Sequence, residues 1–214
     1  MSTVLLEARR LSFDYDSGAP LIAEWSATFR AGEVVAITGP SGRGKSTLLY
    51  LLGLMLAPVK GQIFIAGESV AALPDWTRAN LRAEKFGFVF QDAALDATRT
   101  VLDNVIETAL YRHERRREVI PTALQLMEHF GVQLRAEAKP GQVSGGQAQR
   151  IALCRALLGS PAILLAGEPT GNLDAQSSDV VMRAFTEHAA QGATVVVVTH
   201  DPGVVARCDR TIEL

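Results

Sequence analysis

The sequence predicts an α/β fold built around a mostly parallel sheet. Short, continuously apolar segments of strand length alternate with longer segments of helical composition, as in parallel sheets that are covered on both faces. Ile163 to Ala166 and Val195 to Val198 are such segments. A glycine-rich stretch, Gly39 to Thr47, follows another apolar strand directly and opens a helical segment. At 214 residues, the chain is long enough for one large domain or a core with an inserted lobe.

The composition is that of an ordinary globular protein. The chain is 48% hydrophobic and 21% charged, with a formal net charge of −2, whereas nucleic-acid-binding proteins usually carry a strong basic excess. Its apolar stretches fall well short of the roughly 20 residues of a membrane helix, and its N-terminus lacks signal-peptide features. Cys154 and Cys208 lack metal-ligand spacing and are predicted to be reduced thiols of a cytosolic protein. Any membrane role is therefore expected to come from a separate partner chain.

The N-terminal half is expected to begin with two edge strands and then to enter the main sheet. Apolar and aromatic runs predict the strands, and the polar cluster Asp14 to Pro20 predicts a turn. The predicted strands are Val4 to Phe13, Leu21 to Phe29, Glu33 to Thr38, Gln62 to Ala66 and Phe86 to Phe90. The predicted helices are Lys45 to Leu54 and, after Pro74, Asp75 to Ala83.

The sequence changes character after residue 100. From Thr100 to Phe130, charged helical sequence predominates and the apolar residues roughly follow one helical face. Pro121 is expected to start or kink a helix, because it cannot donate an interior hydrogen bond. The later predicted helices are Ile151 to Leu158 and Asp174 to Ala190, and the later predicted strands are Ala162 to Ala166, Thr194 to Val198 and Thr211 to Leu214.

The glycine-rich stretch after the third predicted strand fits the P-loop pattern G-x-x-x-x-G-K-[ST]. Its glycines allow backbone N–H groups to surround phosphate oxygens, and the following helix start adds positive partial charge. Lys45 is predicted to bind the β- and γ-phosphates, and the Ser46 hydroxyl to ligate Mg²⁺. The predicted nucleotide-binding residues of this loop are Gly39, Pro40, Ser41, Gly42, Arg43, Gly44, Lys45, Ser46 and Thr47.

A second glycine-rich stretch, Val143-Ser144-Gly145-Gly146-Gln147-Ala-Gln149-Arg150, runs into the helical segment that reaches Leu158. The free amides and dipole of such a helix start suit an anion. A plain helix cap is the alternative, although Gly-Gly is a poor choice for helix stability alone. We therefore expect this stretch to bind a nucleotide held by another copy of the chain.

Further motifs follow the order found in one family. They are Gln91 after Phe88-Val-Phe90 as the Q-loop glutamine, Ser144-Gly-Gly-Gln147 as the signature, Glu168 after Ile163-Leu-Leu-Ala166 as the catalytic glutamate, Gly171-Asn-Leu-Asp174 as the D-loop, and His200 as the switch histidine. On these motifs the chain resembles, along nearly its whole length, the nucleotide-binding subunit of ATP-binding cassette (ABC) transporters. The resemblance implies ATP and Mg²⁺ as cofactors.

The resemblance also implies an architecture. It is a P-loop NTPase (RecA-like) core with a mostly parallel sheet, an antiparallel β subdomain and an inserted α-helical subdomain. We expect one nucleotide-binding domain over residues 1–214. Residues 1–91 and 157–214 would form the catalytic core with the β subdomain, and residues 92–156 the helical subdomain with the signature.

The catalytic residues implied are Glu168, His200 and Gln91. Glu168 follows a central strand, where its carboxylate can orient and polarise the attacking water; a solvated surface glutamate is the alternative. His200 ends the next apolar strand and could hydrogen-bond a γ-phosphate oxygen. The remaining histidines, His113, His129 and His188, lack such a context and are expected on helix surfaces.

Further nucleotide contacts are implied outside the P-loop. Tyr15 occupies the position of the aromatic residue that stacks on adenine, with a packing role as the alternative. The signature element would face the γ-phosphate held by the opposite subunit, so that ATP holds a head-to-tail pair together. The residues of this group are Ser144, Gly145, Gly146 and Gln147, with Asp174 of the D-loop. The expected Mg²⁺ ligands are Ser46 and Gln91.

One position departs from the family pattern. The strand before Glu168 normally ends in an aspartate that holds Mg²⁺, usually through water, but here the residue is Gly167. We expect nucleotide still to bind, with reduced Mg²⁺ affinity and turnover; a neutral variation covered by Ser46, Gln91 and water is the alternative. Family members also commonly continue beyond the position of Leu214, so we expect the last sheet edge to be trimmed.

The motifs Gly87-Phe-Val-Phe-Gln91 and Glu168-Pro-Thr-Gly-Asn-Leu-Asp174 are similar to those of the macrolide-export and lipoprotein-release group, which includes the cell-division cassette. The resemblance implies a second copy and an integral membrane permease as partners. The permease would contact residues 92–150 and the groove beside Gln91, placing the chain in the cytoplasm, peripheral on the inner face of the membrane.

The sequence leaves two other functional classes open. One is a soluble ABC ATPase of DNA repair or translation, although these usually carry large insertions or fused cassettes that this chain lacks. The other is a nucleotide-binding regulator with attenuated hydrolysis, which Gly167 favours. No nucleic-acid partner is expected, because Glu114 and Glu118 flank Arg115-Arg116-Arg117 and favour a solvated helix face.

Overall fold

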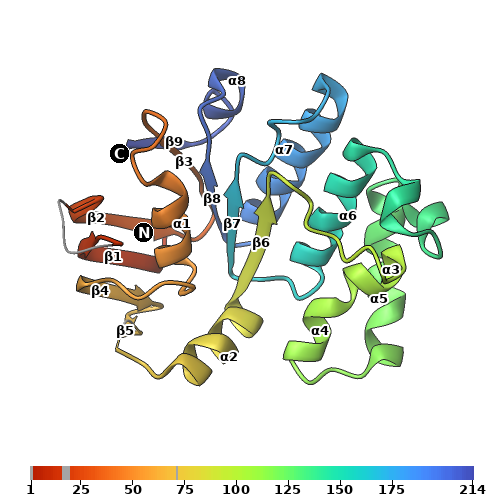
Figure 1. Cartoon of the computed structure of the whole chain (residues 1–214), viewed down its shortest axis with the longest axis horizontal. Coiled ribbons are helices and arrows are strands. Elements are labelled where there is room, and N and C mark those ends of the chain that lie inside the picture. Colours follow the sequence, from red (N-terminus) through yellow and green to blue (C-terminus); the bar gives the residue numbers. More distant parts are fainter. Residues whose placement is uncertain (1, 16–19, 71) are drawn as a thin grey trace.

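A parallel sheet with strand order β6-β7-β8-β3-β9 forms the centre of the fold (Figure 1). The computed structural model of the chain describes residues 2–15, 20–70 and 72–214. The strands of this sheet are Val34–Thr38 (β3), Phe86–Phe90 (β6), Ile163–Gly167 (β7), Thr194–Val198 (β8) and Arg210–Glu213 (β9). β7 and β8 lie between neighbours and have helices on both faces, which explains their continuous apolar sequence. The predicted mostly parallel sheet is confirmed.

A smaller antiparallel sheet has the order β2-β1-β4-β5. Its strands are Val4–Phe13 (β1), Ile22–Arg30 (β2), Lys60–Ile65 (β4) and Glu68–Ser69 (β5). Of the predicted turn between β1 and β2, residues 16–19 lie outside the described part of the chain. The predicted antiparallel β subdomain is therefore present beside the parallel sheet.

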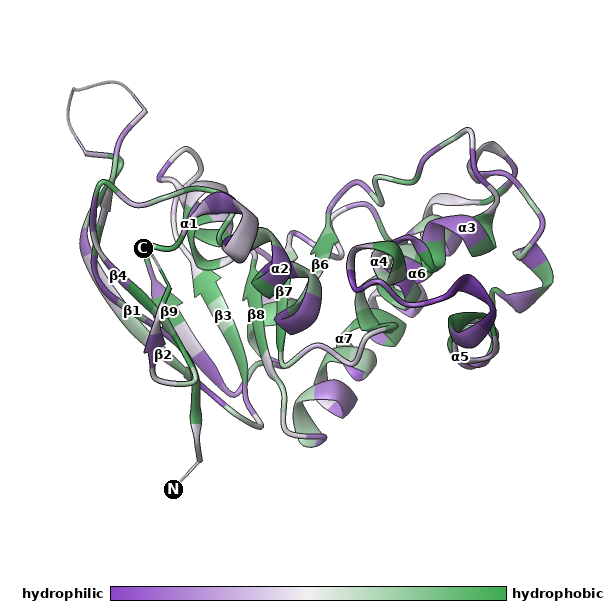
Figure 2. Ribbon diagram, turned by 90° about the horizontal axis from the view of Figure 1, so that it is seen from below, coloured by the Kyte–Doolittle hydropathy of each residue, from purple (hydrophilic) through white to green (hydrophobic). Residues whose placement is uncertain are grey.

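Helices on opposite faces of the parallel sheet create two apolar cores (Figure 2). Lys45–Leu52 (α1) lies between the two sheets, and its Leu48 and Leu51 are fully buried with strand residues of both. Ala175–Ala190 (α7) covers the other face with Val181 and Phe185, which are also fully buried. Burial of such side chains stabilises the fold by about 1.5–3 kcal/mol each.

A helical lobe lies beyond β6, on the far side of the parallel sheet from the antiparallel one (Figure 1). Its elements are Val101–Val105 (α3), Glu107–Tyr111 (α4), Arg116–His129 (α5), the short helices Gln133–Arg135 and Pro140–Gln142, and Gly145–Leu157 (α6). The helices Asp75–Lys85 (α2) and Pro202–Val205 (α8) lie outside this lobe in the chain order, before β6 and after β8. Pro121 lies inside α5, which begins at Arg116, so of the two effects expected of Pro121 the start of a helix is wrong and a kink stays a prediction.

In the described part of the chain, no helix is long and apolar enough to span a bilayer. Cys154 is buried, which raises the pKa of its thiol to about 12, and both cysteines are free.

Candidate functional site

The P-loop connects the carboxyl end of β3 to α1. Gly44, directly before α1, has a φ of 87°, a left-handed conformation that side chains with a Cβ rarely adopt. A Cβ on Gly39 would lie 2.7 Å from the backbone oxygen of Leu214. Lys45 Nζ donates hydrogen bonds to the carbonyl oxygens of Gly39 (2.8 Å) and Pro40 (2.9 Å). These bonds hold the ammonium group within the turn of the loop, where it can attract a phosphate.

A cavity of about 610 Å³ opens beside this loop. The P-loop residues in its lining are Ser41, Gly42, Gly44, Lys45, Ser46 and Thr47. The other residues in its lining are Leu21, Leu49, Tyr50, Phe90, Gln91, Asp92, Ala94, Gly167, Glu168 and Val198. Because the carboxyl ends of parallel strands meet at one edge of a sheet, the ends of β6, β7 and β8 bring Gln91 and Glu168 to the P-loop. The cavity has the size of a small-molecule site.

Glu168 follows β7 and is held by the end of β8. Its φ is 45°, which is uncommon for a residue other than glycine. The backbone N–H of Glu168 donates to the carbonyl oxygen of Val198 at 2.8 Å. Thr199 Oγ1 donates to Glu168 Oε2 at 3.2 Å, and His200 Nδ1 lies 2.7 Å from Oε1. The carboxylate is thus positioned by two side chains at the edge of the cavity.

The contact between His200 and Glu168 also fixes the role of the imidazole. An ionised carboxylate only accepts hydrogen bonds, so Nδ1 carries the proton in this contact. The side chain of His200 is 75% exposed, which leaves Nε2 as the atom that can contact a ligand. Thr199 was missed as a positioning residue; a hydroxyl residue between a buried strand and a candidate histidine was the available signal.

Gln91 lies between the cavity and the loop that follows Glu168. A Cβ on Gly171 would lie 3.3 Å from Gln91 Nε2, so glycine allows the amide to pack against that loop. Asp92 lines the same cavity and was missed in the sequence, where its position next to Gln91 was the available signal.

The cavity offers oxygen donors of the kind that Mg²⁺ takes. Ser46, Gln91 and Asp92 all line it, and Mg²⁺ is usually bound by one or two carboxylates together with water and substrate phosphates. The described residues contain no group of three or more His, Cys, Asp or Glu side chains able to hold a metal ion by themselves. The donors therefore fit a Mg²⁺ ion that is held largely by phosphate and water.

Neither the backbone conformation nor the space at residue 167 requires a glycine. Its φ is outside the positive range, and a Cβ would meet Cδ2 of Leu49 at 3.2 Å, which is the end of a flexible side chain. An aspartate could therefore be accommodated here. Glycine in place of the family's aspartate therefore leaves the cavity with one carboxylate fewer, and the fold does not require this change.

Tyr15 lies beside α1 rather than in the lining of the cavity. Its hydroxyl oxygen is 3.1 Å from Thr47 Oγ1, and its ring packs edge-on against Phe13 with 4.9 Å between the centroids. Tyr15 is 63% exposed, so much of its surface is available for stacking. Its role toward adenine stays a prediction.

The second glycine-rich stretch forms the capped start of α6. Ser144 Oγ accepts a hydrogen bond from the backbone N–H of Gln147 (3.3 Å), and Gln147 Oε1 accepts one from the backbone N–H of Ser144 (3.0 Å). This reciprocal capping box satisfies N–H groups that have no partner inside the helix. As a result α6 begins at Gly145, as expected for a helix start at residues 144–146, and it extends the predicted helical segment Ile151 to Leu158 toward the N-terminus.

The start of α6 packs closely against α7. A Cβ on Gly146 would lie 2.7 Å from Ser177 Oγ, whereas Gly145 faces open space. The backbone N–H of Ser177 donates to Asp174 Oδ1 at 2.7 Å, and this bond holds the pKa of Asp174 below its ordinary value. The predicted signature and D-loop residues thus share the neighbour Ser177. Residues 144–147 and Asp174 do not line the P-loop cavity of their own chain.

His188 corrects the expectation of a surface position. It is only 8% exposed, and its Nε2 lies 2.7 Å from the carbonyl oxygen of Pro161. Because a carbonyl oxygen only accepts, Nε2 carries the proton. Burial lowers the pKa of His188. His113 and His129 are exposed, although His113 lies in the turn after α4.

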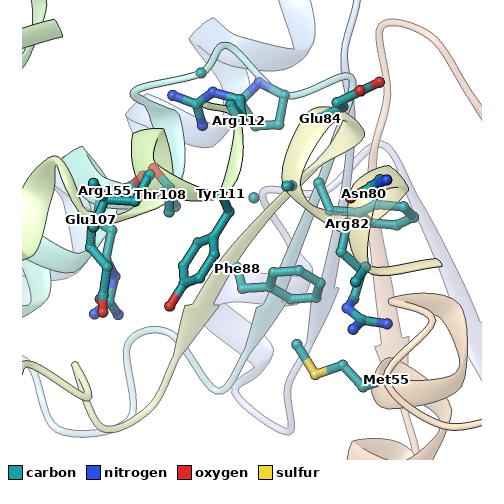
Figure 3. A pocket seen from close by; sticks show the side chains of 18 of the residues that line it. Met55, Asn80, Arg82, Glu84, Phe88, Glu107, Thr108, Tyr111, Arg112 and Arg155 are labelled. Atoms are coloured by element: carbon teal, nitrogen blue, oxygen red, sulfur yellow. The ribbon is translucent and has the colours of Figure 1, made fainter. Parts of the chain in front are cut away.

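A second cavity, of about 590 Å³, lies between α2, β6, α4 and the end of α6. Figure 3 shows the aromatic rings of Phe88 and Tyr111 with Met55 at its wall, and the cavity is also bordered by charged side chains. Tyr111 is 63% exposed and Met55 40%. Phe90, at the end of β6, lines both this cavity and the P-loop cavity. The two cavities therefore share a wall.

The chain is similar to known transport proteins over its whole length. Residues 22–171 match the family described as ABC transporter. The lipoprotein-releasing system ATP-binding protein LolD of Xanthomonas axonopodis pv. citri is 41% identical over 217 residues, covering 100% of this chain and 89% of LolD. The macrolide export ATP-binding/permease protein MacB of Rhodopseudomonas palustris is 43% identical, covering 100% of this chain but 33% of MacB.

Two solved structures of an ABC transporter cassette are also similar to this chain. The structure described as the dimeric bacterial ABC transporter cassette MJ0796 superposes with a TM-score of 0.90 at 33% identity, covering 98% of this chain and 94% of that one. A structure of MJ0796 in a dimeric post-hydrolysis state, bound to ADP and Pi, matches with the same TM-score of 0.90 and the same coverage.

Proposed function

The chain belongs to the ABC transporter family, and from that premise we propose that two copies of it clasp ATP between them and drive a separate integral membrane permease. The chain is an ATP-binding cassette with ATPase activity. The observation that carries the proposed pairing is the separation of two elements within one chain. Lys45 and Glu168 border the P-loop cavity, whereas the capped start of α6 lies outside it. A head-to-tail pair would bring that helix start to the nucleotide of the other copy.

The residues of the cavity have distinct tasks in hydrolysis. Lys45 and the P-loop amides bind the phosphates, and Ser46 with Gln91 would hold Mg²⁺, which when bound neutralises charge on the β- and γ-phosphates. Glu168 orients the attacking water and accepts its proton. His200 donates from Nδ1 to Glu168 and offers Nε2 to the γ-phosphate. In the pair, the N–H groups at the start of the partner's α6 would add positive partial charge on the opposite side.

The second cavity is the proposed docking site of the permease. Its wall of aromatic and aliphatic side chains, with exposed Tyr111 and Met55, suits an apolar segment that a membrane protein presents on the cytoplasmic side. Phe90 connects this site to the nucleotide cavity. The similarity to LolD and MacB supports a permease of the lipoprotein-release and macrolide-export group. The chain would then be peripheral on the inner face of the membrane.

The pairing is tested with Glu168→Gln, which should bind ATP without turning it over. Light scattering is expected to show a dimer in saturating ATP and a monomer in ADP. The variant Lys45→Ala, combined with Glu168→Gln, is the control and should remain monomeric in ATP. A Glu168→Gln variant that stays monomeric in ATP, alone and beside the permease, contradicts the proposal.

The docking site is tested separately by co-purification with the membrane subunit. Tyr111→Ala and Met55→Ser are expected to abolish co-purification while leaving ATP binding intact. Val59→Ser is the control, because Val59 is 59% exposed and lies outside both the cavity lining and residues 92–150. Equal co-purification by the cavity variants and the control would exclude this surface.

A further inference from the structure

Gln149 is a buried polar residue of α6 that lines neither of the two cavities. It is 2% exposed, and its Nε2 donates to the carbonyl oxygens of Phe90 (2.9 Å) and Pro169 (3.1 Å). Because both partners only accept, the amide nitrogen must face them, which fixes the orientation of the side chain. Phe90 directly precedes Gln91, and Pro169 directly follows Glu168. One side chain therefore joins α6 to the two loops that carry catalytic residues.

The same helix holds the far side of the Gln91 loop. Arg155 donates from Nη1 to the carbonyl oxygen of Ala94 (2.9 Å) and from Nη2 to that of Ala93 (2.7 Å). A Cβ on Gly87 of β6 would lie 2.6 Å from the carbonyl oxygen of Ala156, so strand and helix are in direct contact. The loop that contains Gln91 is thus attached to α6 before and after that residue. Gln149 makes the attachment directly before Gln91 and also holds the residue after Glu168.

We propose that Gln149 is a positioning residue that couples the start of α6 to Gln91 and Glu168. The proposal rests on the proposed function, in which the start of α6 contacts the nucleotide of the other copy. A movement of α6 without the two loops would leave a buried amide and two carbonyl groups without partners, which is energetically costly. The helix and the loops therefore move together. Through Gln149, contact with the nucleotide of one copy adjusts the catalytic residues that act on the nucleotide of the other.

The first test compares two buried amides. Gln149→Met removes the donors and keeps the size of the side chain. Asn104→Leu is the matched control, because Asn104 is 0% exposed, its Nδ2 donates to the carbonyl oxygens of Asp96 and Thr100, and its Oδ1 accepts from the N–H of Asp96. These bonds hold the entry to α3 and involve neither Phe90 nor Pro169. Gln149→Met is expected to lower kcat about tenfold with KM for ATP changed less than about twofold. Asn104→Leu should lower the melting temperature comparably with kcat nearly unchanged. Equal losses of kcat in both variants, or a wild-type kcat in Gln149→Met, overturn the proposal.

The second test uses pH. In Gln149→Glu a buried carboxyl group would face two carbonyl oxygens, which raises its pKa, and its protonated form would restore one hydrogen bond. The ratio of the kcat of Gln149→Glu to that of wild type is expected to rise about threefold from about pH 8 to about pH 6. For Gln149→Met the same ratio should stay constant. A constant ratio for Gln149→Glu contradicts the role of the amide as donor.

Hydrogen exchange of the isolated chain separates this inference from the proposed function. Gln149→Met is expected to accelerate amide exchange in residues 91–95 and 170–173, and Asn104→Leu is not. Unchanged exchange in both loops overturns the role of Gln149. Failure of the pairing is a different result, seen as a Glu168→Gln variant that remains monomeric in saturating ATP.

Discussion

The imidazole of His200 is hydrogen-bonded to the carboxylate of Glu168, with 2.7 Å between Nδ1 and Oε1. These residues end neighbouring parallel strands, β8 and β7, and are far apart in the sequence. Their contact makes the exposed Nε2 of His200 the ligand-facing atom. It also orients the carboxylate that serves the attacking water.

Replacing His200 by Ala should lower the rate of ATP hydrolysis about 100-fold, because it removes both the orientation of Glu168 and the contact to the γ-phosphate. ATP affinity, measured by fluorescence of a labelled nucleotide, is expected to change little. His129→Ala is the control, since its side chain is 60% exposed and lies on α5. A wild-type rate in His200→Ala would show that the contact has no catalytic role.

Gly167→Asp should lower the Mg²⁺ concentration needed for half-maximal ATPase activity and raise the maximal rate. The substitution adds a carboxylate to the cavity, and the nearest obstacle to its Cβ is the flexible end of Leu49 at 3.2 Å. Gly167→Asn controls for side-chain volume without charge. Equal Mg²⁺-dependent rates in wild type and Gly167→Asp would mean that the glycine is a neutral variation.

Gly146→Ala should destabilise the chain by about 1 kcal/mol or more, because its Cβ would lie 2.7 Å from Ser177 Oγ. Gly145→Ala, facing open space, should instead stabilise it by up to about 1 kcal/mol. The measurement is the free energy of unfolding in urea. Adding Ser177→Ala to Gly146→Ala should recover most of the loss relative to Ser177→Ala alone. An additive double variant would exclude this contact as the cause.

The free energy of unfolding should fall as the pH decreases from about 7 to about 5, partly because of His188. Burial lowers the pKa of His188, so the unfolded chain takes up a proton at a higher pH than the folded chain does. The stability that this residue contributes is present above the unfolded pKa of about 6.5 and is lost as the pH falls toward the folded pKa. His188→Gln should weaken this pH dependence. Identical pH profiles for wild type and His188→Gln would contradict the prediction.

The fold could be predicted because its central strands are buried on both faces. β7 and β8 are continuous apolar runs, and both were placed to within a residue or so. The fold class, the family and the ATPase activity are confirmed by the comparisons. Helical composition was clear only from Ile151 onward, because Gly-Gly has low helix propensity, but the helix start expected at residues 144–146 is confirmed and is stabilised by the capping box of Ser144 and Gln147.

The remaining misses have two different physical causes. His188 shares a helical face with Phe185 and Val181, so spacing along α7 could have placed it in the core. Gln149 was part of the second glycine-rich stretch, but its attachment to the two loops gave no local signal, because its acceptors lie 59 and 20 residues away in sequence. Only the packing of α6 against β6 and β7 brings them together.

Because the P-loop cavity and the capped start of α6 are separate in one chain, each ATP site of the proposed pair takes its two halves from different copies. A copy with a damaged Lys45 still presents an intact Ser144, and the reverse also holds. Mixed in one assembly, two such defective alleles would reconstitute one complete ATP site and leave the other broken on both sides. Complementation between alleles that are each inactive alone is thus a consequence of where a single helix begins.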